Sequence, residues 1–491
     1  MGSLGKRFDL SKLAVASVLA YWVVLSFVGT ASVLPVAAQG IELTKGPYLQ
    51  NATQASVNVC WETNEIHSGA VMYGKTLEYG SIALTKGRAK DHCVSLTGLE
   101  PYTRYYYQVW GSEKELFSGG TFKTLAGPEG RISFVAWGDN RTNHPIHRRL
   151  VGLIKEAAPD FVINVGDLVE NGSRKSDWDT FFDVERELLV DVPLYPTLGN
   201  HEQNSYLYFA LFDLPGTERW YSFDSGPAHF IALDVAFSDY KPGSEQYDWL
   251  EQDLRQTTRP WKIVYLHYPP YSFTPFRGSE LPVREALTPL FEKYGVQLAF
   301  SGHNHHYQRN LVNGVTYIVT GGGGAPLHPV GWGVGTQYAE ETYEFVKLSI
   351  DGGVLTSTVV SLDGTQFDPF VLSLPTKVEE QKALVLGMSA PVIPQAAVVP
   401  EELAGVSRAP NSAVSISLIE SVSCIRCHDP FRLDNRTLLL YGWDFHRPLI
   451  VAGGFALILA ALMMVLSGRH LFPNLRTRRR PVNDASGAAH S

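Results

Sequence analysis

The chain has 491 residues, of which 45% are hydrophobic and 18% charged, and it carries a formal net charge of −8. This length accommodates two or three domains, and the acidic balance disfavours a specific nucleic-acid partner, because nucleic acids are bound by a basic face. Four cysteines are too few for a disulfide scaffold.

The first 39 residues resemble an export segment. Lys6, Arg7 and Lys12 flank the start of an almost uncharged stretch, Leu13 to Ala38, whose last three residues are small enough for a cleavage site. The apolar run is longer than a usual signal core, so a cleaved signal peptide and an uncleaved N-terminal anchor are both open.

Residues 43–125 are predicted to form a β-sandwich. Segments 55–61 and 92–99 alternate apolar and polar residues, which is typical of half-buried strands. Segment 96–105 resembles the corner of a fibronectin type III domain, and this resemblance implies that Tyr105 is the corner tyrosine.

The same resemblance places Trp61 in the core of the sandwich. It also places Cys60 and Cys93 on neighbouring strands. A disulfide between them is compatible with export, and two buried thiols are the alternative.

Residues 130–375 are predicted to form an α/β domain. Short apolar runs, each bounded by turn or polar residues as buried strands are, cover 132–137, 161–165, 229–233, 262–266 and 297–300. Residues of metal-ligand type follow most of these runs directly, where α/β folds build their sites.

The candidate metal ligands are Asp139, Asp167, Asn200, His267, His303 and His305. Carboxylate, amide and imidazole groups suit iron, manganese and zinc alike. Asp167 has two oxygens and is expected to bridge two metals about 3.5 Å apart, which would supply a hydroxide near neutral pH and neutralise charge on a phosphoryl group.

His201 follows the ligand Asn200 directly. We expect it to face the substrate and to protonate the leaving oxygen as a general acid. Glu202 is expected to orient His201 through a hydrogen bond.

This set of segments resembles the calcineurin-like metallophosphoesterases. Segments 45–50, 220–230 and 302–309 are also similar to the purple acid phosphatase branch, which carries a fibronectin-like N-terminal domain. The resemblance covers roughly residues 43–375 and implies an αββα sandwich that acts on phosphate monoesters, with diesters as the alternative.

The resemblance also implies how the metals are shared. Asp139, Asp167 and His305 would hold one metal. The other would be held by Asp167, Asn200, His267 and His303.

Two positions depart from the family pattern. Glu170 stands where the purple enzymes have an iron-binding tyrosine, so the protein is expected not to be purple. Arg141 stands where other members have a histidine, which predicts a ligand-poor first metal site. Arg141 is expected to bind the substrate phosphate, and pairing with a carboxylate is the alternative.

Residues 376–415 have the composition of a linker, and segment 416–447 follows. In that segment Cys424, Cys427 and His428 match the attachment pattern of c-type haem. Covalent haem c is therefore one interpretation, with a local disulfide or a zinc site as the alternatives.

Residues 448–467 are predicted to form a transmembrane helix. The apolar run from Leu449 to Leu466 would be roughly 27 Å long at about 1.5 Å per residue. Arginines in the tail 468–491 would stay cytoplasmic, which places the catalytic domain outside the cytoplasm.

The sequence thus predicts a single-pass, membrane-anchored metallophosphoesterase with two metal ions and a small phosphorylated substrate. A non-catalytic surface protein that binds a partner or presents haem is the rival hypothesis.

Overall fold

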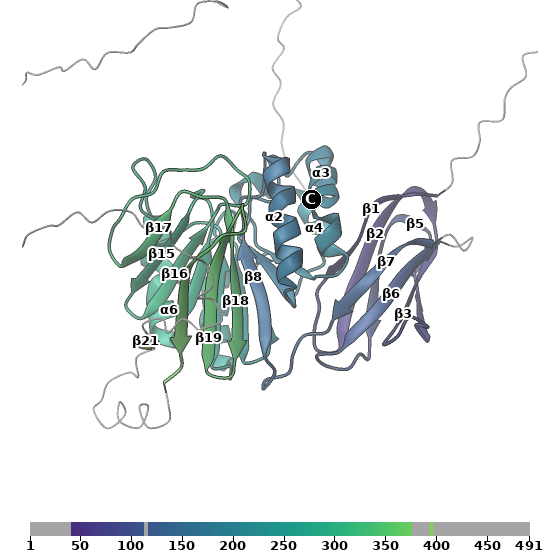
Figure 1. Cartoon of the computed structure of the whole chain (residues 1–491), viewed down its shortest axis with the longest axis horizontal. Helices are drawn as coiled ribbons and strands as arrows, with labels where there is room; N and C mark the ends of the chain where they lie inside the picture. Colours follow the sequence, from purple (N-terminus) through teal and green to yellow (C-terminus); the bar gives the residue numbers. More distant parts are fainter. Residues whose placement is uncertain (1–40, 112–115, 376–392, 396–491) are drawn as a thin grey trace, which may run out of the picture. The chain divides into compact units, whose positions relative to one another are not determined.

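The computed structural model describes residues 41–111, 116–375 and 393–395, and Figure 1 shows their arrangement. The predicted export segment (1–39), haem segment (416–447), membrane helix (448–467) and basic tail (468–491) lie outside these residues, as does most of the predicted linker (376–415). Within the described ranges, no helix combines the length and the apolar character needed to cross a bilayer.

The N-terminal domain consists of two antiparallel sheets. One has the order β1-β2-β5, with β1 at Leu43–Gln50, β2 at Ser56–His67 and β5 at Ala89–Thr97. The other has the order β4-β3-β6-β7, with β4 at Ser81–Leu84, β3 at Gly69–Gly74, β6 at Arg104–Gly111 and β7 at Leu116–Lys123. Buried and exposed side chains alternate along β5 and β6, so each sheet presents one apolar face to the core.

The residues singled out in this domain have clear positions. Trp61 is 1% exposed in the core, and the hydroxyl of Tyr105 accepts a hydrogen bond from the backbone N–H of Glu100 at 3.0 Å. Cys60 and Cys93 occupy paired positions on β2 and β5 and form a disulfide. The structure therefore has the disulfide rather than two buried thiols.

The second domain contains two seven-stranded sheets. The first has the order β10-β9-β8-β18-β19-β20-β21, with the bounds Leu194–Pro196, Phe161–Asn164, Ile132–Trp137, Glu344–Asp351, Val354–Ser361, Gln366–Ser373 and Ile393–Gln395. The second has the order β11-β12-β13-β14-β16-β15-β17, with the bounds Tyr221–Ser225, Ala228–Leu233, Trp261–Leu266, Leu298–Ser301, Val315–Thr320, Tyr307–Val312 and Thr336–Glu340.

Five of these strands, β8, β9, β12, β13 and β14, coincide with the apolar runs that predicted an α/β sheet. β21 lies in the segment predicted as a linker, where it pairs with β20 in antiparallel register. The helices are α2 (His144–Ala157), α3 (Lys175–Leu189), α4 (Tyr206–Leu211), α5 (Glu245–Gln256) and α6 (Leu281–Tyr294), with a short 3-10 helix η1 (Asn200–Glu202).

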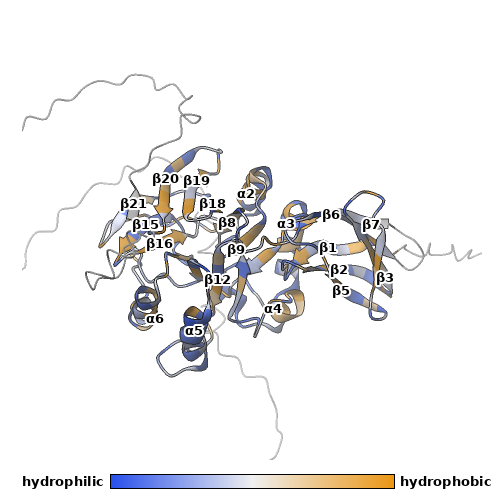
Figure 2. Cartoon of the chain, turned by 90° about the horizontal axis from the view of Figure 1, so that it is seen from below, coloured by the Kyte–Doolittle hydropathy of each residue, from blue (hydrophilic) through white to orange (hydrophobic). Residues whose placement is uncertain are grey.

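The two sheets face each other across an aromatic layer. Phe230 of β12 packs against Phe134 of β8 and Phe161 of β9, with ring centroids 5.0 and 5.1 Å apart. Hydrophilic residues predominate on α5 (Figure 2), and its apolar Leu250 and Leu254 are buried in a second cluster on the outer face of the second sheet. With α2 and α3 on the other side, the layers are helix, sheet, sheet and helix.

Strand direction decides where a site can form. β8, β9 and β10 run parallel, and so do β12, β13, β14 and β16. The carboxyl ends of parallel strands open at the same edge of each sheet, so the loops that follow them meet there.

The sandwich contacts the segment that follows α3. The hydroxyl of Tyr107 donates a hydrogen bond to the carbonyl oxygen of Val190 at 2.7 Å. The backbone N–H of Thr121 donates to the carboxylate of Asp191 at 2.7 Å. These bonds satisfy buried polar groups at the junction of the two domains.

A buried charge cluster lies at the other end of the second sheet. His229 of β12 has its two ring nitrogens 2.7 Å from Asp224 Oδ1 and 2.8 Å from Asp253 Oδ2. Burial opposes a charge on His229, but the hydrogen bonds to the two carboxylates outweigh it and raise its pKa to about 9. Arg259 Nε also donates to Asp224, at 3.0 Å.

We expect His229→Gln to destabilise the fold in a pH-dependent way. The folded-state pKa lies above the unfolded value of about 6.5, so the stabilisation, up to about 3 kcal/mol, is fully present below about pH 6.5. It is lost as the pH rises through about 9. Denaturant unfolding at acidic and alkaline pH measures the difference, with the exposed His144→Gln as the control. A loss of equal size at both pH values would contradict the prediction.

Candidate metal centre

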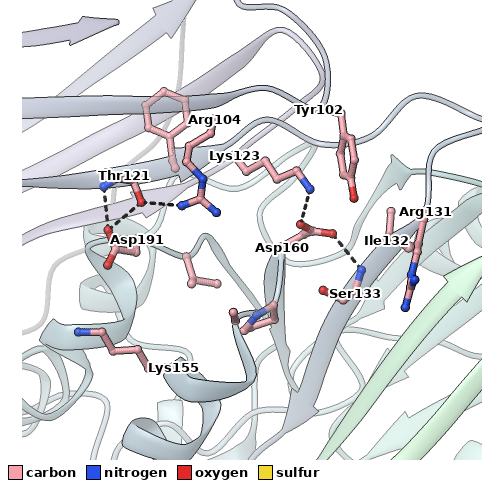
Figure 3. A pocket seen from close by; sticks show the side chains of 14 residues that line it. Tyr102, Arg104, Thr121, Lys123, Arg131, Ile132, Ser133, Lys155, Asp160 and Asp191 are labelled. Carbon is pink, nitrogen blue, oxygen red and sulfur yellow. Dashed lines mark hydrogen bonds and ion pairs between the residues drawn. The ribbon is translucent and has the colours of Figure 1, made fainter. Parts of the chain in front are cut away.

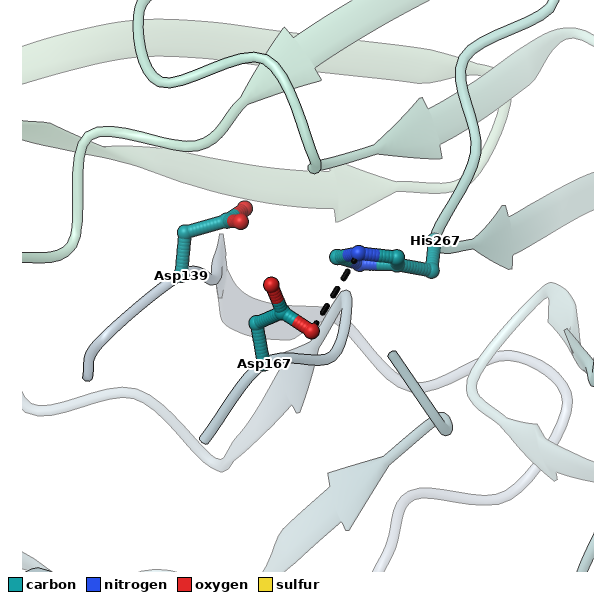
Figure 4. Close-up of side chains that lie close together, drawn as sticks. All are labelled: Asp139, Asp167 and His267. Carbon is teal, nitrogen blue, oxygen red and sulfur yellow. Dashed lines mark ion pairs between the residues drawn. The ribbon is translucent and has the colours of Figure 1, made fainter. Parts of the chain in front are cut away.

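The candidate ligands all come from loops at the carboxyl ends of strands. They are Asp139 after β8, Asp167 after β9, Asn200 in η1 after β10, His267 after β13, and His303 and His305 after β14. Candidate ligand atoms of Asp139, Asp167 and His267 lie within 4.8 Å of one another, and Figure 4 shows the three side chains converging.

The remaining ligands adjoin this group. His267 Nε2 lies 3.3 Å from Asp167 Oδ1 and 3.1 Å from Asn200 Oδ1. His305 Nε2 lies 3.4 Å from Asp139 Oδ1, and the rings of His303 and His267 are 5.1 Å apart. The fold therefore brings together all six candidate ligands from five loops.

Two imidazoles are oriented by backbone carbonyls. His267 Nδ1 lies 2.9 Å from the carbonyl oxygen of Val165, and His305 Nδ1 lies 2.6 Å from that of Pro326. A carbonyl oxygen accepts only, so each Nδ1 carries the proton and each Nε2 is left with a lone pair directed at the carboxylates.

The protonation states also suit metal binding. Burial, followed by the neighbouring His267, lowers the pKa of His303 to about 2. Burial alone would raise the pKa of Asp139, but its interactions with His305, His267 and His303 outweigh burial and hold that pKa below its ordinary value. Neutral imidazole and ionised carboxylate are the forms that coordinate metals, and Asp139 Oδ1 is buried without a hydrogen-bond partner. The residues present therefore fit a metal centre.

The backbone at the ligands is unusual. Asp139, Asp167 and His303 have φ values of 56°, 57° and 66°, a left-handed conformation that costs free energy and is concentrated at functional sites. A Cβ atom on Gly302 would lie 2.3 Å from Asp139 Oδ2, and one on Gly199 would lie 2.3 Å from Asp167 Oδ1. Glycine is required at both positions because the chain passes so close to the carboxylates.

The two positions that depart from the family pattern contact each other. Arg141 Nη1 lies 2.5 Å from Glu170 Oε2, and Arg141 Nε lies 3.5 Å from Asp167 Oδ2. Glu170 therefore holds the guanidinium of Arg141, so the alternative, pairing with a carboxylate, is what the structure has. That Arg141 binds the substrate phosphate stays a prediction.

His201 lies at the edge of the ligand cluster. Its Nε2 is 3.9 Å from Asp167 Oδ2, its side chain is 24% exposed, and its Nδ1 lies 2.7 Å from the carbonyl oxygen of Glu170. A carbonyl accepts only, so Nδ1 carries a proton and Nε2 faces the open side of the site.

The expectation for Glu202 was wrong. Its carboxylate makes no hydrogen bond with His201 but accepts hydrogen bonds from the backbone N–H groups of Asp167, Leu168 and Gly199 at 2.9, 2.8 and 2.6 Å. A buried carboxylate satisfied by three backbone donors acts as an anchor between loops. Glu202 therefore fixes the loop that carries Asp167.

Sequence reasoning missed two residues beside the centre. Arg277 Nη1 lies 3.4 Å from His303 Nε2, and the ring of His328 stacks on His305 with centroids 4.0 Å apart. Neither residue belongs to a motif, because each comes from a loop whose position depends on tertiary contacts.

The loop that carries Arg277 is tethered to the ligand segment. Asn304, between two histidine ligands, donates from Nδ2 to Ser272 Oγ at 2.8 Å and to the carbonyl oxygen of Gly278 at 3.3 Å. Ser279 Oγ in turn donates to the carbonyl oxygen of Ser272 at 3.1 Å and closes the loop. The loop of Arg277, at the rim of the site, is thus hydrogen-bonded to the segment that would bind metal.

Comparison with known proteins identifies the domain. Residues 134–307 match the family described as calcineurin-like phosphoesterase. The chain is 31% identical over 265 residues to purple acid phosphatase 21 of Arabidopsis thaliana, covering 48% of this chain and 58% of the relative. It is 30% identical over 288 residues to purple acid phosphatase 15 of the same plant, covering 48% and 53%.

Among solved structures, purple acid phosphatase PPD1 from yellow lupin matches with a TM-score of 0.62 at 21% identity, over 72% of this chain and 77% of that one. At this identity the likeness shows the fold. The chain spans less than two thirds of the length of these curated relatives. Residues 134–307 form a calcineurin-like metallophosphoesterase domain, and the chain has homologues among the purple acid phosphatases.

Proposed function

We propose that this chain hydrolyses phosphate monoesters with the help of two metal ions. The observation that carries the proposal is the convergence of six carboxylate, amide and imidazole ligands at one edge of the two sheets. The relatives bear the name acid phosphatase, which supports a phosphate ester as the substrate. Phosphate diesters are the alternative.

The metals, when bound, supply an activated water and neutralise charge on the phosphoryl oxygens. Asp139, Asp167 and His305 would hold one ion. Asp167, Asn200, His267 and His303 would hold the other. Iron, manganese and zinc all accept these ligands.

The ion pair Arg141–Glu170 makes the two metal positions unequal. The guanidinium stands 3.5 Å from a carboxylate oxygen of Asp167, and its positive charge opposes a cation on that side. The first position also has three ligands from the chain, against four for the second. We therefore infer weaker binding at the first position.

His201 has the geometry of a general acid. With Nδ1 held by the carbonyl oxygen of Glu170, its Nε2 is the nitrogen that can pass a proton to the leaving oxygen. That transfer requires the imidazolium form, in which both nitrogens carry protons.

His201→Asn is expected to lower kcat by about 10²–10⁴-fold for an alkyl phosphate, whose leaving group needs a proton. The loss should be much smaller for p-nitrophenyl phosphate, whose leaving group departs as an anion. Steady-state kinetics with both esters measures the ratio. Equal losses with the two substrates would show that His201 acts on structure or metal binding rather than as the acid.

Removal of metal with a chelator is expected to abolish turnover, and added iron, manganese or zinc should restore it. Asn200→Ala should lower the metal content of the purified protein, because it deletes one oxygen ligand. Elemental analysis and turnover of monoester and diester substrates test this, with the buried but non-ligating Asn310→Ala as a control. Undiminished partner binding without any turnover would instead favour the non-catalytic hypothesis.

We also propose that segment 448–467 anchors the chain in a membrane, with the phosphoesterase domain outside the cytoplasm. The apolar run and the arginines after it support this. In protein whose N-terminal segment 1–39 has been cleaved, deletion of residues 448–491 should release the protein from the membrane fraction. Protease added to intact cells or spheroplasts should cleave the full-length chain. Protection from that protease would contradict the orientation.

Covalent haem on Cys424 and Cys427 stays a prediction, for which a Soret band is the readout.

A further inference from the structure

A cavity lies where the sandwich meets the α/β domain (Figure 3). Its volume is about 560 Å³, within the range of roughly 300–1,000 Å³ typical of small-molecule sites. β6 and β7 line one side, and the start of β8, the end of α2 and the segment after α3 line the other. None of its lining residues is a candidate metal ligand.

Four basic side chains surround the cavity, two from each domain. The sandwich contributes Arg104 and Lys123, and the α/β domain contributes Arg131 and Lys155. Arg131 and Lys155 lie on opposite sides of the cavity in Figure 3, with Arg104 and Lys123 along the wall formed by the sandwich. Both walls of the cavity therefore carry basic residues.

The two acidic residues of the lining are already engaged. Asp160 Oδ1 lies 3.1 Å from Lys123 Nζ, and its Oδ2 accepts a hydrogen bond from the backbone N–H of Ser133 at 2.9 Å. Asp191 Oδ1 accepts from the backbone N–H of Thr121 at 2.7 Å. Of the four cations, only Lys123 is neutralised by these carboxylates.

Two of the other three cations, Arg104 and Arg131, lack a counter-ion among the described residues. Within the described part of the chain, neither Arg104 nor Arg131 forms an ion pair, and Arg104 donates only to the hydroxyl of Thr121, at 3.3 Å. Lys155 lies 3.9 Å from Glu187, whose side chain is 77% exposed, and such surface pairs are weak. Four basic and two acidic residues leave the lining with a net charge of +2 (4 − 2).

We propose that this cavity binds a small soluble anion that carries several phosphate groups, at a site separate from the metal centre. Guanidinium groups match phosphate oxygens with paired hydrogen bonds, and two guanidinium groups without counter-ions favour a multivalent anion over a single charge. The volume exceeds what one phosphate group fills. Since each domain supplies two of the cations, the bound anion ties the sandwich to the catalytic domain.

Binding of tripolyphosphate to the full-length protein tests the proposal. Chelator is kept present so that metal ions do not recruit the anion, and calorimetry and thermal unfolding are the readouts. We expect saturable binding that weakens with added salt and a rise in Tm. The double variant Arg104→Gln/Arg131→Gln should lose about tenfold or more in affinity, together with the rise in Tm, while its Tm without ligand stays unchanged because both residues are exposed.

Two controls locate the binding. Arg149→Gln removes an exposed arginine of α2 that does not line the cavity, so it should bind tripolyphosphate like the wild type. His303→Ala should also keep the binding. Absence of saturable binding, equal loss in Arg149→Gln, or loss in His303→Ala would each overturn the proposal, as would equal affinity for orthophosphate and tripolyphosphate.

Discussion

The candidate metal centre depends on the close approach of glycine backbone to two carboxylates. Gly199 passes Asp167 and Gly302 passes Asp139 at distances that leave no room for a Cβ atom. These approaches lock loops from different strands against the ligands, and the left-handed backbone of Asp139 and Asp167 aims the carboxylates inward. The strain is tolerated because the strands of two packed sheets hold the start of each loop.

The charged side chains around the site are positioned by this arrangement of the backbone. Glu202 collects three backbone N–H groups and so fixes the loop of Asp167 without touching the reacting groups. Arg141 and Glu170 form an ion pair beside the same carboxylate. A fixed ion pair, rather than a further ligand, thus lies beside the carboxylate that is proposed to bridge the two metals. In the sequence, Arg141 and Glu170 are two separate departures from the family pattern. In the fold, they form one ion pair.

The sequence predicted the strands and the ligand residues because both have local signatures. Apolar runs reveal buried strands, and an Asp, Asn or His directly after such a run reveals a site at the sheet edge. Contacts between side chains that are far apart in the sequence have no such local signature. Arg141 and Glu170 are 29 residues apart, and the partners of Glu202, the stacking of His328 and the contact of Arg277 all depend on how loops pack. The sequence left undecided whether Cys60 and Cys93 form a disulfide, because that depends on the register in which the two strands pair.

Asn304 stands between two histidine ligands and holds the loop of Arg277 through Ser272 and Gly278. The ligand segment and the loop of Arg277 therefore share hydrogen bonds. If either segment moves away, polar groups of the other lose their hydrogen-bond partners. Such segments unfold locally as one cooperative unit. Metal ions that hold His303 and His305 in place would thus also slow the exchange of backbone amides in the loop of Arg277, so that the free energy of metal binding would also order this loop.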